Sequence, residues 1–131
     1  MQVLEIRTSQ REQFYEITRE IKGIVKDNGL RNALMSVYCP HTTAGITINE
    51  AADPSVPIDI LTQLSKVVPH KGDYQHLEGN SDAHIKSSLI GCNQQIILQN
   101  GSLVLGTWQG VFFTEFDGPR TRKVYVQWVL T

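Results

Sequence analysis

Histidine is the residue type with the clearest chemical potential in this chain, and all four copies fall in its middle. His76 and His84 bracket the polar segment EGNSD, where a turn at Gly79 would bring the first histidine over the start of a helix that carries the second. Neutral imidazoles and carboxylates suit zinc and similar divalent ions, although this spacing is not one of the usual ligand spacings. A metal site and a plain pair of surface histidines both stay open, and His70 is interpreted as an ordinary loop histidine.

The start of the helix expected near Asn80 has a second possible use. Free backbone N–H groups over Ser81, Asp82 and Ala83 would favour an anion such as phosphate, because the helix dipole is positive there. The simpler interpretation is an ordinary polar helix cap. Sequence alone does not separate the two.

His41, Thr42 and Thr43 place an acid–base group and two hydroxyls at a strand junction, just before Gly45, where backbone can approach a ligand. The same residues could form an ordinary threonine-rich turn. Asn49, Glu50 and Asp53 follow in one short connection. Their carboxylates could bind Mg²⁺, act as acid–base groups or merely cap the next helix.

Two charged residues near the C-terminus also need an explanation. Glu115 interrupts an apolar strand face formed by Val111 and Phe113, so its carboxylate requires a partner or a solvent-filled pocket. Arg120 follows a Gly-Pro turn, where it could bind phosphate or pair with Asp117.

Periodicity predicts the elements that must position these residues. Alternating apolar positions predict strands, and apolar spacing of three and four predicts helices. Asn100-Gly101 predicts a hairpin, and residues 117–120 are expected to join the last two strands in a second one. In the third helix we expect Ile85 and Leu89 to face the core. The strands are expected over 2–8, 33–38, 44–48, 95–99, 103–105, 111–116 and 122–130, and the helices over 18–28, 55–68 and 81–90.

Composition limits the class of protein. The chain has 131 residues, of which 40% are apolar and 19% charged, with a formal net charge of −1. Length and composition therefore predict one folded domain over residues 1–131. Its strand and helix runs are segregated rather than regularly alternating, which favours an α+β fold. The chain has no run of Lys or Arg, so nucleic acid is not an expected partner. No segment resembles a signal peptide or a membrane span, so a cytoplasmic protein is expected. Cys39 and Cys92 match no CxxC spacing and are interpreted as reduced thiols without chemistry. The apolar last strand favours a partner subunit.

Three separated segments carry a resemblance that covers nearly the whole chain. CPHTTAGITINEAADP, HLEGNSDAHIKSSLIG and LGTWQGVFFTEFDGPRTRKVYVQ resemble the secondary thiamine-phosphate synthase family, also called the YjbQ-type family. The resemblance implies a YjbQ-like α+β fold, a two-layer β-sandwich with helices on the outside that forms a homotrimer. It also implies weak thiamine-phosphate synthase activity, which joins hydroxymethylpyrimidine diphosphate to thiazole phosphate and releases pyrophosphate.

The candidate residues and the matching positions together define the expected site. A divalent ion, Zn²⁺ or Mg²⁺, would assist loss of pyrophosphate from a phosphorylated small-molecule substrate. Two alternatives are a metal-dependent phosphate-ester hydrolase and a non-enzymatic trimeric protein that binds a metal or a phosphometabolite. The expected catalytic residues are His41, His84, Glu50, Asp53 and Glu115; the substrate-binding residues are Thr42, Thr43, Asn49, Asn80, Ser81, Gln109 and Arg120; and the metal ligands are His41, His76 and His84.

Overall fold

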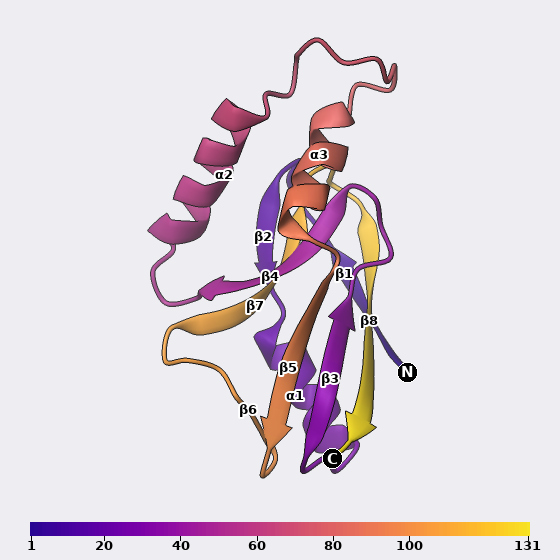
Figure 1. Ribbon diagram of the computed structural model, residues 1–131, viewed down its shortest axis with the longest axis vertical. Helices are drawn as coiled ribbons and strands as arrows, with labels where there is room; N and C mark the ends of the chain where they lie inside the picture. Colours follow the sequence, from indigo (N-terminus) through magenta and orange to yellow (C-terminus); the bar gives the residue numbers. More distant parts are fainter.

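The structure is a computed structural model that describes residues 1–131 as eight strands and three helices (Figure 1). The mixed α+β class is therefore as predicted. None of the helices has the length and apolar character needed to cross a membrane. In chain order the elements are β1 (Gln2–Arg7), β2 (Gln13–Glu16), α1 (Thr18–Asp27), β3 (Ala33–Tyr38), β4 (Ala44–Glu50), α2 (Ser55–Val67), α3 (Ser81–Ile90), β5 (Asn93–Gln99), β6 (Ser102–Leu103), β7 (Gln109–Glu115) and β8 (Thr121–Leu130).

The strands form two antiparallel sheets, one with the order β1-β8-β3-β5-β6 and the other with the order β2-β7-β4. The predicted hairpin at Asn100-Gly101 is confirmed, because β5 pairs with β6. The second predicted hairpin is wrong, since β7 and β8 belong to different sheets. Both edges of β7 are occupied by β2 and β4, so the chain turns a corner after Glu115 instead of folding back. The short, half-buried β2 has too little pattern to be predicted.

The two sheets and α1 share one core of 18 buried residues. Ile21, Ile24 and Val25 bury the inner face of α1 at helical spacing, which explains why this helix could be predicted from sequence. Ile46 and Phe113 come from the three-stranded sheet and are fully buried in the same cluster. The core therefore holds together the two sheets that carry the candidate site.

Helices α2 and α3 pack very differently (Figure 1). Helix α2 has no buried residue, whereas α3 lies against β4 and buries Asp82, Ala83, Lys86 and Ser87. A long loop over residues 68–80 joins the two helices.

The prediction that Ile85 and Leu89 face the core is wrong, because they are 40% and 61% exposed. The inward face of α3 is polar instead, and its charges are paired. Asp82 accepts hydrogen bonds from both terminal nitrogens of Arg11 at 3.0 and 3.2 Å and from Lys86 Nζ at 3.0 Å. Lys86 also donates to Glu12 at 3.1 Å. Pairing of this kind is what allows charged residues to be buried.

A glycine permits the close approach of α3 and β4. A Cβ atom on Gly45 would lie 2.6 Å from the carbonyl oxygen of Gly91 and 3.1 Å from Thr114 Oγ1. Gly91 itself has φ +95°, which favours glycine where the chain leaves α3. These two glycines set the distance between α3, which carries His84, and the strand that follows His41.

Candidate functional site

A polar hollow of about 400 Å³ lies where the start of β4, the start of α3 and the corner between β7 and β8 meet. No apolar side chain other than that of a proline lines it. It brings together six of the predicted site residues and adds three charged residues that are not among them: Glu78, Asp117 and Arg122. The polar hollow is lined by Pro40, His41, Thr42, Thr43, Glu78, Asn80, His84, Asp117, Arg120 and Arg122. We call this set of residues the polar hollow below; Glu115, also predicted, lies directly beneath it.

Glu115 is fully buried and pairs with Arg122, which is 2% exposed. Arg122 donates from Nε to Glu115 Oε1 at 2.9 Å and from Nη2 to Oε2. Thr8 and the backbone N–H of Asp117 also donate to this carboxylate, at 2.8 and 3.1 Å. Arg122 Nη2 reaches Thr43 Oγ1 at 2.9 Å. Glu115 thus has the partner that a carboxylate in an apolar strand requires. From beneath the hollow it orients Arg122, and Arg122 in turn orients the hydroxyl of Thr43.

Asp117 joins α3 to the β7–β8 corner. Its Oδ2 atom accepts from Asn80 Nδ2 at 2.9 Å and from Arg120 Nη2 at 3.1 Å, and its backbone carbonyl accepts from Arg120 Nε at 2.9 Å. The Arg120–Asp117 pair that we considered is therefore present. Arg120 is nevertheless half exposed, and its Nη1 group is free to donate to a ligand.

The side chain of Asn80 is committed to Asp117, so it does not cap α3. Its Oδ1 atom is buried and has no hydrogen-bond partner. If the Asn80 amide were flipped, its oxygen would face the Asp117 carboxylate, and two acceptors cannot form a hydrogen bond. The Asp117 carboxylate therefore determines which way the Asn80 amide points. Buried acceptors usually have a partner. Asn80 therefore offers an acceptor beside the hollow, and α3 begins without a side-chain cap.

His41 is held as a neutral imidazole in a defined tautomer. Its Nε2 atom accepts the backbone N–H of Lys123 at 2.9 Å, which leaves the ring proton on Nδ1. Burial, reinforced by the positive charge of Arg122, lowers the pKa of His41 below its ordinary value. In this arrangement His41 offers an N–H donor, and a metal could bind Nε2 only after the bond to Lys123 is broken.

His84 is the residue that connects the hollows around α3. Besides the polar hollow, it lines a hollow of about 410 Å³ beneath the 73–76 loop, which includes His76 and Ser81. It also lines a third hollow of about 510 Å³, which we call the side hollow. The side hollow is lined by His41, Thr42, Ala44, His84, Ser87, Ser88, Gly91 and Cys92.

The three histidines predicted as metal ligands do not form a ligand set within this chain. The rings of His76 and His84 meet edge to face with centroids 5.4 Å apart, and His76 Nε2 lies 3.7 Å from Glu78 Oε2. However, no group of three or more histidine, cysteine, aspartate or glutamate side chains is placed to hold a metal ion. His41 is oriented by Lys123 instead. The divalent ion stays a prediction.

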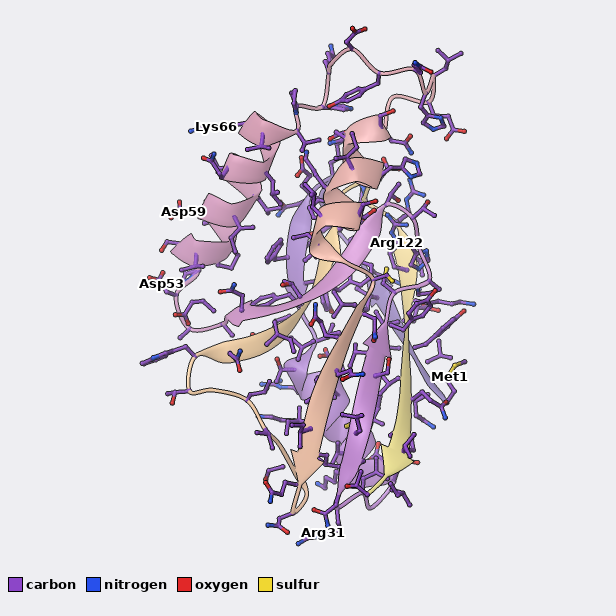
Figure 2. All side chains as sticks on the ribbon, viewed as in Figure 1. Met1, Arg31, Asp53, Asp59, Lys66 and Arg122 are labelled. Atoms are coloured by element: carbon purple, nitrogen blue, oxygen red, sulfur yellow. The ribbon has the colours of Figure 1, made fainter.

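Four other predicted residues lie apart from the polar hollow. Asn49 and Glu50 are at the far end of β4 from Thr43, about 20 Å away for an extended strand of this length. Figure 2 shows Asp53 at the left edge of the molecule and Arg122 to the right of its centre. Their side chains serve local turns: Glu50 accepts from Ala52 N at 3.0 Å, and Asp53 from Ser55 N at 2.9 Å.

Gln109 belongs to this distant group as well. It pairs with Glu50 across β4 and β7, and its side-chain oxygen accepts from Gly106 N at 2.8 Å. Hydrogen bonds from Ser55 lower the pKa of Asp53, which is consistent with a turn-capping carboxylate. The catalytic roles of Glu50 and Asp53 stay predictions, as does substrate binding by Asn49 and Gln109. These residues could reach the polar hollow only if it were the hollow of another copy of the chain.

Fold and site together define an α+β protein whose antiparallel sheets and three helices position a polar, histidine-containing hollow. A family model described as UPF0047 protein YjbQ-like matches residues 2–131. The chain belongs to this YjbQ-like family.

The relatives are close over nearly their whole length. The chain is 54% identical over 123 residues to a UPF0047 protein of Methanocaldococcus jannaschii, which covers 94% of this chain and 89% of the relative. It is 49% identical to the UPF0047 protein YugU of Bacillus subtilis, covering 97% of each. A crystal structure of a YjbQ/UPF0047 family protein from Clostridium acetobutylicum is 56% identical, with a TM-score of 0.96 over 98% of this chain and 100% of the other.

These comparisons correct the expected function. The family and its relatives are described only as UPF0047 proteins, and the Clostridium acetobutylicum protein is described as uncharacterized. The prediction of a weak thiamine-phosphate synthase is therefore wrong as a conclusion from family membership, because the resemblance establishes the family and not that activity. The same comparisons support the α+β fold, but not the expected trimer.

Proposed function

We propose that the polar hollow binds a phosphorylated small molecule, with Arg120, Thr42 and His41 as the principal donors. The observation that carries the proposal is the convergence of these donors in one hollow of about 400 Å³ that no large apolar side chain lines. A phosphate has several acceptor oxygens and no need for apolar contact, and arginine is well suited to bind it.

The hydrogen bonds already present support this assignment of donors. Asp117 occupies Nε and Nη2 of Arg120 and thereby orients the guanidinium while Nη1 remains for a ligand. The bond from Lys123 leaves the proton of His41 on Nδ1, so the ring can donate to a phosphate oxygen without being charged. The uncapped start of α3 adds a favourable dipole.

The acidic residues in and beneath the hollow are compatible with an anionic ligand. Asp117 is already paired with Arg120 and Asn80, and Glu115 neutralises Arg122. Glu78 has a 74% exposed side chain and is free to turn away. The unpaired, buried Asn80 Oδ1 favours a ligand that carries a hydroxyl or amine donor, as the organic part of a phosphate ester can.

Proton transfer would follow from the same geometry. His41 and His84 both line the polar hollow, and histidine is the side chain most often used for acid–base chemistry near neutral pH. We propose these two residues as the groups that exchange protons with the bound molecule.

The test is isothermal titration calorimetry with glycerol 3-phosphate, and with glycerol and sulfate as reference ligands. We expect saturable binding of the phosphate ester, no binding of glycerol, and at least a tenfold loss of affinity in Arg120→Met and Thr42→Val. Arg7→Met is the matched control, because Arg7 is 83% exposed on β1 and outside the hollow. Binding that is unchanged in Arg120→Met and Thr42→Val would refute the proposed site.

A divalent metal ion is a separate proposal, centred on His76 and His84. Their adjacent rings supply two ligands, and Glu78 is the nearest carboxylate to His76. Further ligands would have to come from water or from another chain, because this chain groups no third residue there. Metal analysis of wild type and His76→Ala after incubation with Zn²⁺ or Mg²⁺ tests this: equal metal content in the two proteins excludes His76 as a ligand.

The expected homotrimer is a third proposal, supported by the outer face of the five-stranded sheet. Leu34, Ile97 and Val129 are neighbours in register across β3, β5 and β8 and are 40%, 56% and 68% exposed. Apolar rows of this kind usually mark an interface. Light scattering should give about three times 14.7 kDa. Val129→Lys should lower that mass and the exposed Glu20→Lys should not, whereas a monomeric wild type would end the proposal.

A further inference from the structure

Cys39 and Cys92 lie directly opposite one another where β3 ends and β5 begins. The paired residues of β3 and β5 end at Tyr38 and Asn93, and the next pair in the same register is Cys39 and Cys92. The backbone N–H of Cys39 donates to the carbonyl of Cys92 at 2.7 Å. Opposed residues in such a hydrogen-bonded pair have Cα atoms about 5.5 Å apart, which lies within the range that a disulfide bridges, roughly 4.4–6.8 Å.

Strand alternation, continued by one residue beyond β3 and β5, predicts that the two thiols lie on the same side of the sheet. Side chains alternate along a strand, so Cys39 shares the inner face of β3 with Met35 and Val37, and Cys92 shares that of Gln94 and Ile96. Their electrostatic coupling agrees with this placement. Burial is the main reason that the pKa of Cys39 is raised to about 11, and a negative charge on Cys92 contributes to the rise.

The two cysteines differ in access. Cys39 is 1% exposed, and its Sγ donates to the carbonyl of His41 at 3.8 Å. Cys92 is exposed and lines the side hollow beside His41 and His84. A reagent from solution therefore reacts first with the exposed Cys92, and the buried Cys39 is placed to act as the resolving thiol.

We propose that Cys39 and Cys92 form an oxidisable dithiol, a modification site for peroxides that closes to an intrachain disulfide. In the first step the Cys92 thiolate attacks a peroxide oxygen, the O–O bond breaks, and Cys92 becomes a sulfenic acid as water is released. In the second step Cys39 loses its proton and attacks the Cys92 sulfur, the S–O bond breaks, and a second water leaves. The two sulfurs together supply the two electrons that reduce the peroxide.

The disulfide would act beside the candidate site. It removes the S–H group that now donates to the His41 carbonyl. It also links the segment that leads from β3 to His41 covalently to the segment that follows α3. Oxidation thus becomes a way to alter the surroundings of His41. The formation of the disulfide does not depend on the ligand proposed above, so the two proposals fail independently.

The test treats the reduced protein with hydrogen peroxide and follows thiols with Ellman's reagent under denaturing conditions, together with intact mass and peptide mapping. The chain has two cysteines, so we expect both thiols to disappear with loss of two hydrogen atoms in mass, and both to return with dithiothreitol. The product should run as a single chain on a non-reducing gel. A disulfide between two chains, or peroxide-treated protein with a free Cys39 thiol, overturns the proposal.

Two variants separate the roles of the thiols. In Cys39→Ala, Cys92 should stop at sulfenic acid, which dimedone traps, because the resolving thiol is absent. In Cys92→Ser, the buried Cys39 should keep its thiol through the same treatment. If Cys39→Ala does not fold, peroxide treatment of the wild-type protein in the presence of dimedone tests the proposal by itself. High-yield dimedone labelling of Cys92 in the wild type would show that Cys39 does not resolve the sulfenic acid.

Discussion

Glu115 on β7 and Arg122 on β8 form a buried ion pair across the corner between the two sheets. The chain needs only a short turn to bring them together, yet the two residues belong to sheets with different strand orders. Thr8 and the N–H of Asp117 complete the hydrogen bonds of the carboxylate. This pair therefore links β1, β7 and β8 beneath the polar hollow.

The first prediction concerns this pair. Glu115→Gln should lower the free energy of unfolding by about 3–5 kcal/mol, because it leaves the Arg122 charge buried without a counter-ion. Urea unfolding monitored by circular dichroism measures the change. Glu5→Gln is the control: the Glu5–Arg7 pair is exposed with a 3.9 Å separation, so its loss should change stability by less than about 0.5 kcal/mol. Equal effects of the two substitutions would contradict a structural role for the buried pair.

The second prediction compares two glycines with opposite expected signs. Gly45→Ala should destabilise the protein by about 1–3 kcal/mol, because the new Cβ atom meets the carbonyl of Gly91. Gly23→Ala should stabilise it by up to about 1 kcal/mol, since Gly23 lies within α1 with open space around it and alanine favours helix. Thermal unfolding of both variants measures the difference. A stable Gly45→Ala protein would show that α3 can move away from β4 at little cost.

The third prediction concerns acid stability. Burial alone would raise the pKa of Asp82, but hydrogen bonds from Arg11 and Lys86 outweigh it and hold the pKa of this carboxyl below its ordinary value. A carboxyl with a lowered folded-state pKa contributes stability above its unfolded pKa, about 3.9, and loses that contribution as pH falls through the folded value.

The measurement for Asp82 is the free energy of unfolding of wild type and Asp82→Asn between pH 3 and pH 6. Wild type should be the more stable above about pH 4, and the gap between the two should narrow as the solution becomes more acidic. Asp59→Asn, on the exposed side of α2, serves as the control and should follow wild type throughout. A gap that stays constant with pH would show that protonation of Asp82 contributes nothing to acid unfolding.

The fourth prediction uses two neighbouring serines. Ser87 Oγ lies 2.6 Å from the carbonyl of Thr42 and 3.0 Å from that of His84, whereas Ser88 Oγ reaches only His84, at 2.8 Å. Ser87→Ala should cost about 1 kcal/mol of stability and weaken binding of glycerol 3-phosphate, because it releases the segment that carries Thr42. Ser88→Ala should leave binding unchanged. If both variants bind as wild type does, the Ser87–Thr42 bond does not position the hollow.

Much of the local structure was determined by sequence patterns that act over a few residues. Apolar spacing in α1, strand alternation and the Asn100-Gly101 turn predicted elements close to those observed. Local composition also singled out His41, Asn80, His84 and Arg120, which line the polar hollow, because strand junctions, helix starts and tight turns are where backbone and polar groups become accessible to ligands. These features depend on neighbours in the chain, which is why they could be predicted.

Contacts between distant segments were decided only by the tertiary structure. The register of β3 and β5 places Cys39 opposite Cys92, and the separation of β7 and β8 into two sheets creates the corner where Arg122 meets Glu115. The length of β4 likewise separates Glu50 from His41, although both had been expected in one site. Strand pairing sets these distances, and pairing is selected by burial in the shared core rather than by the residue types within any one segment.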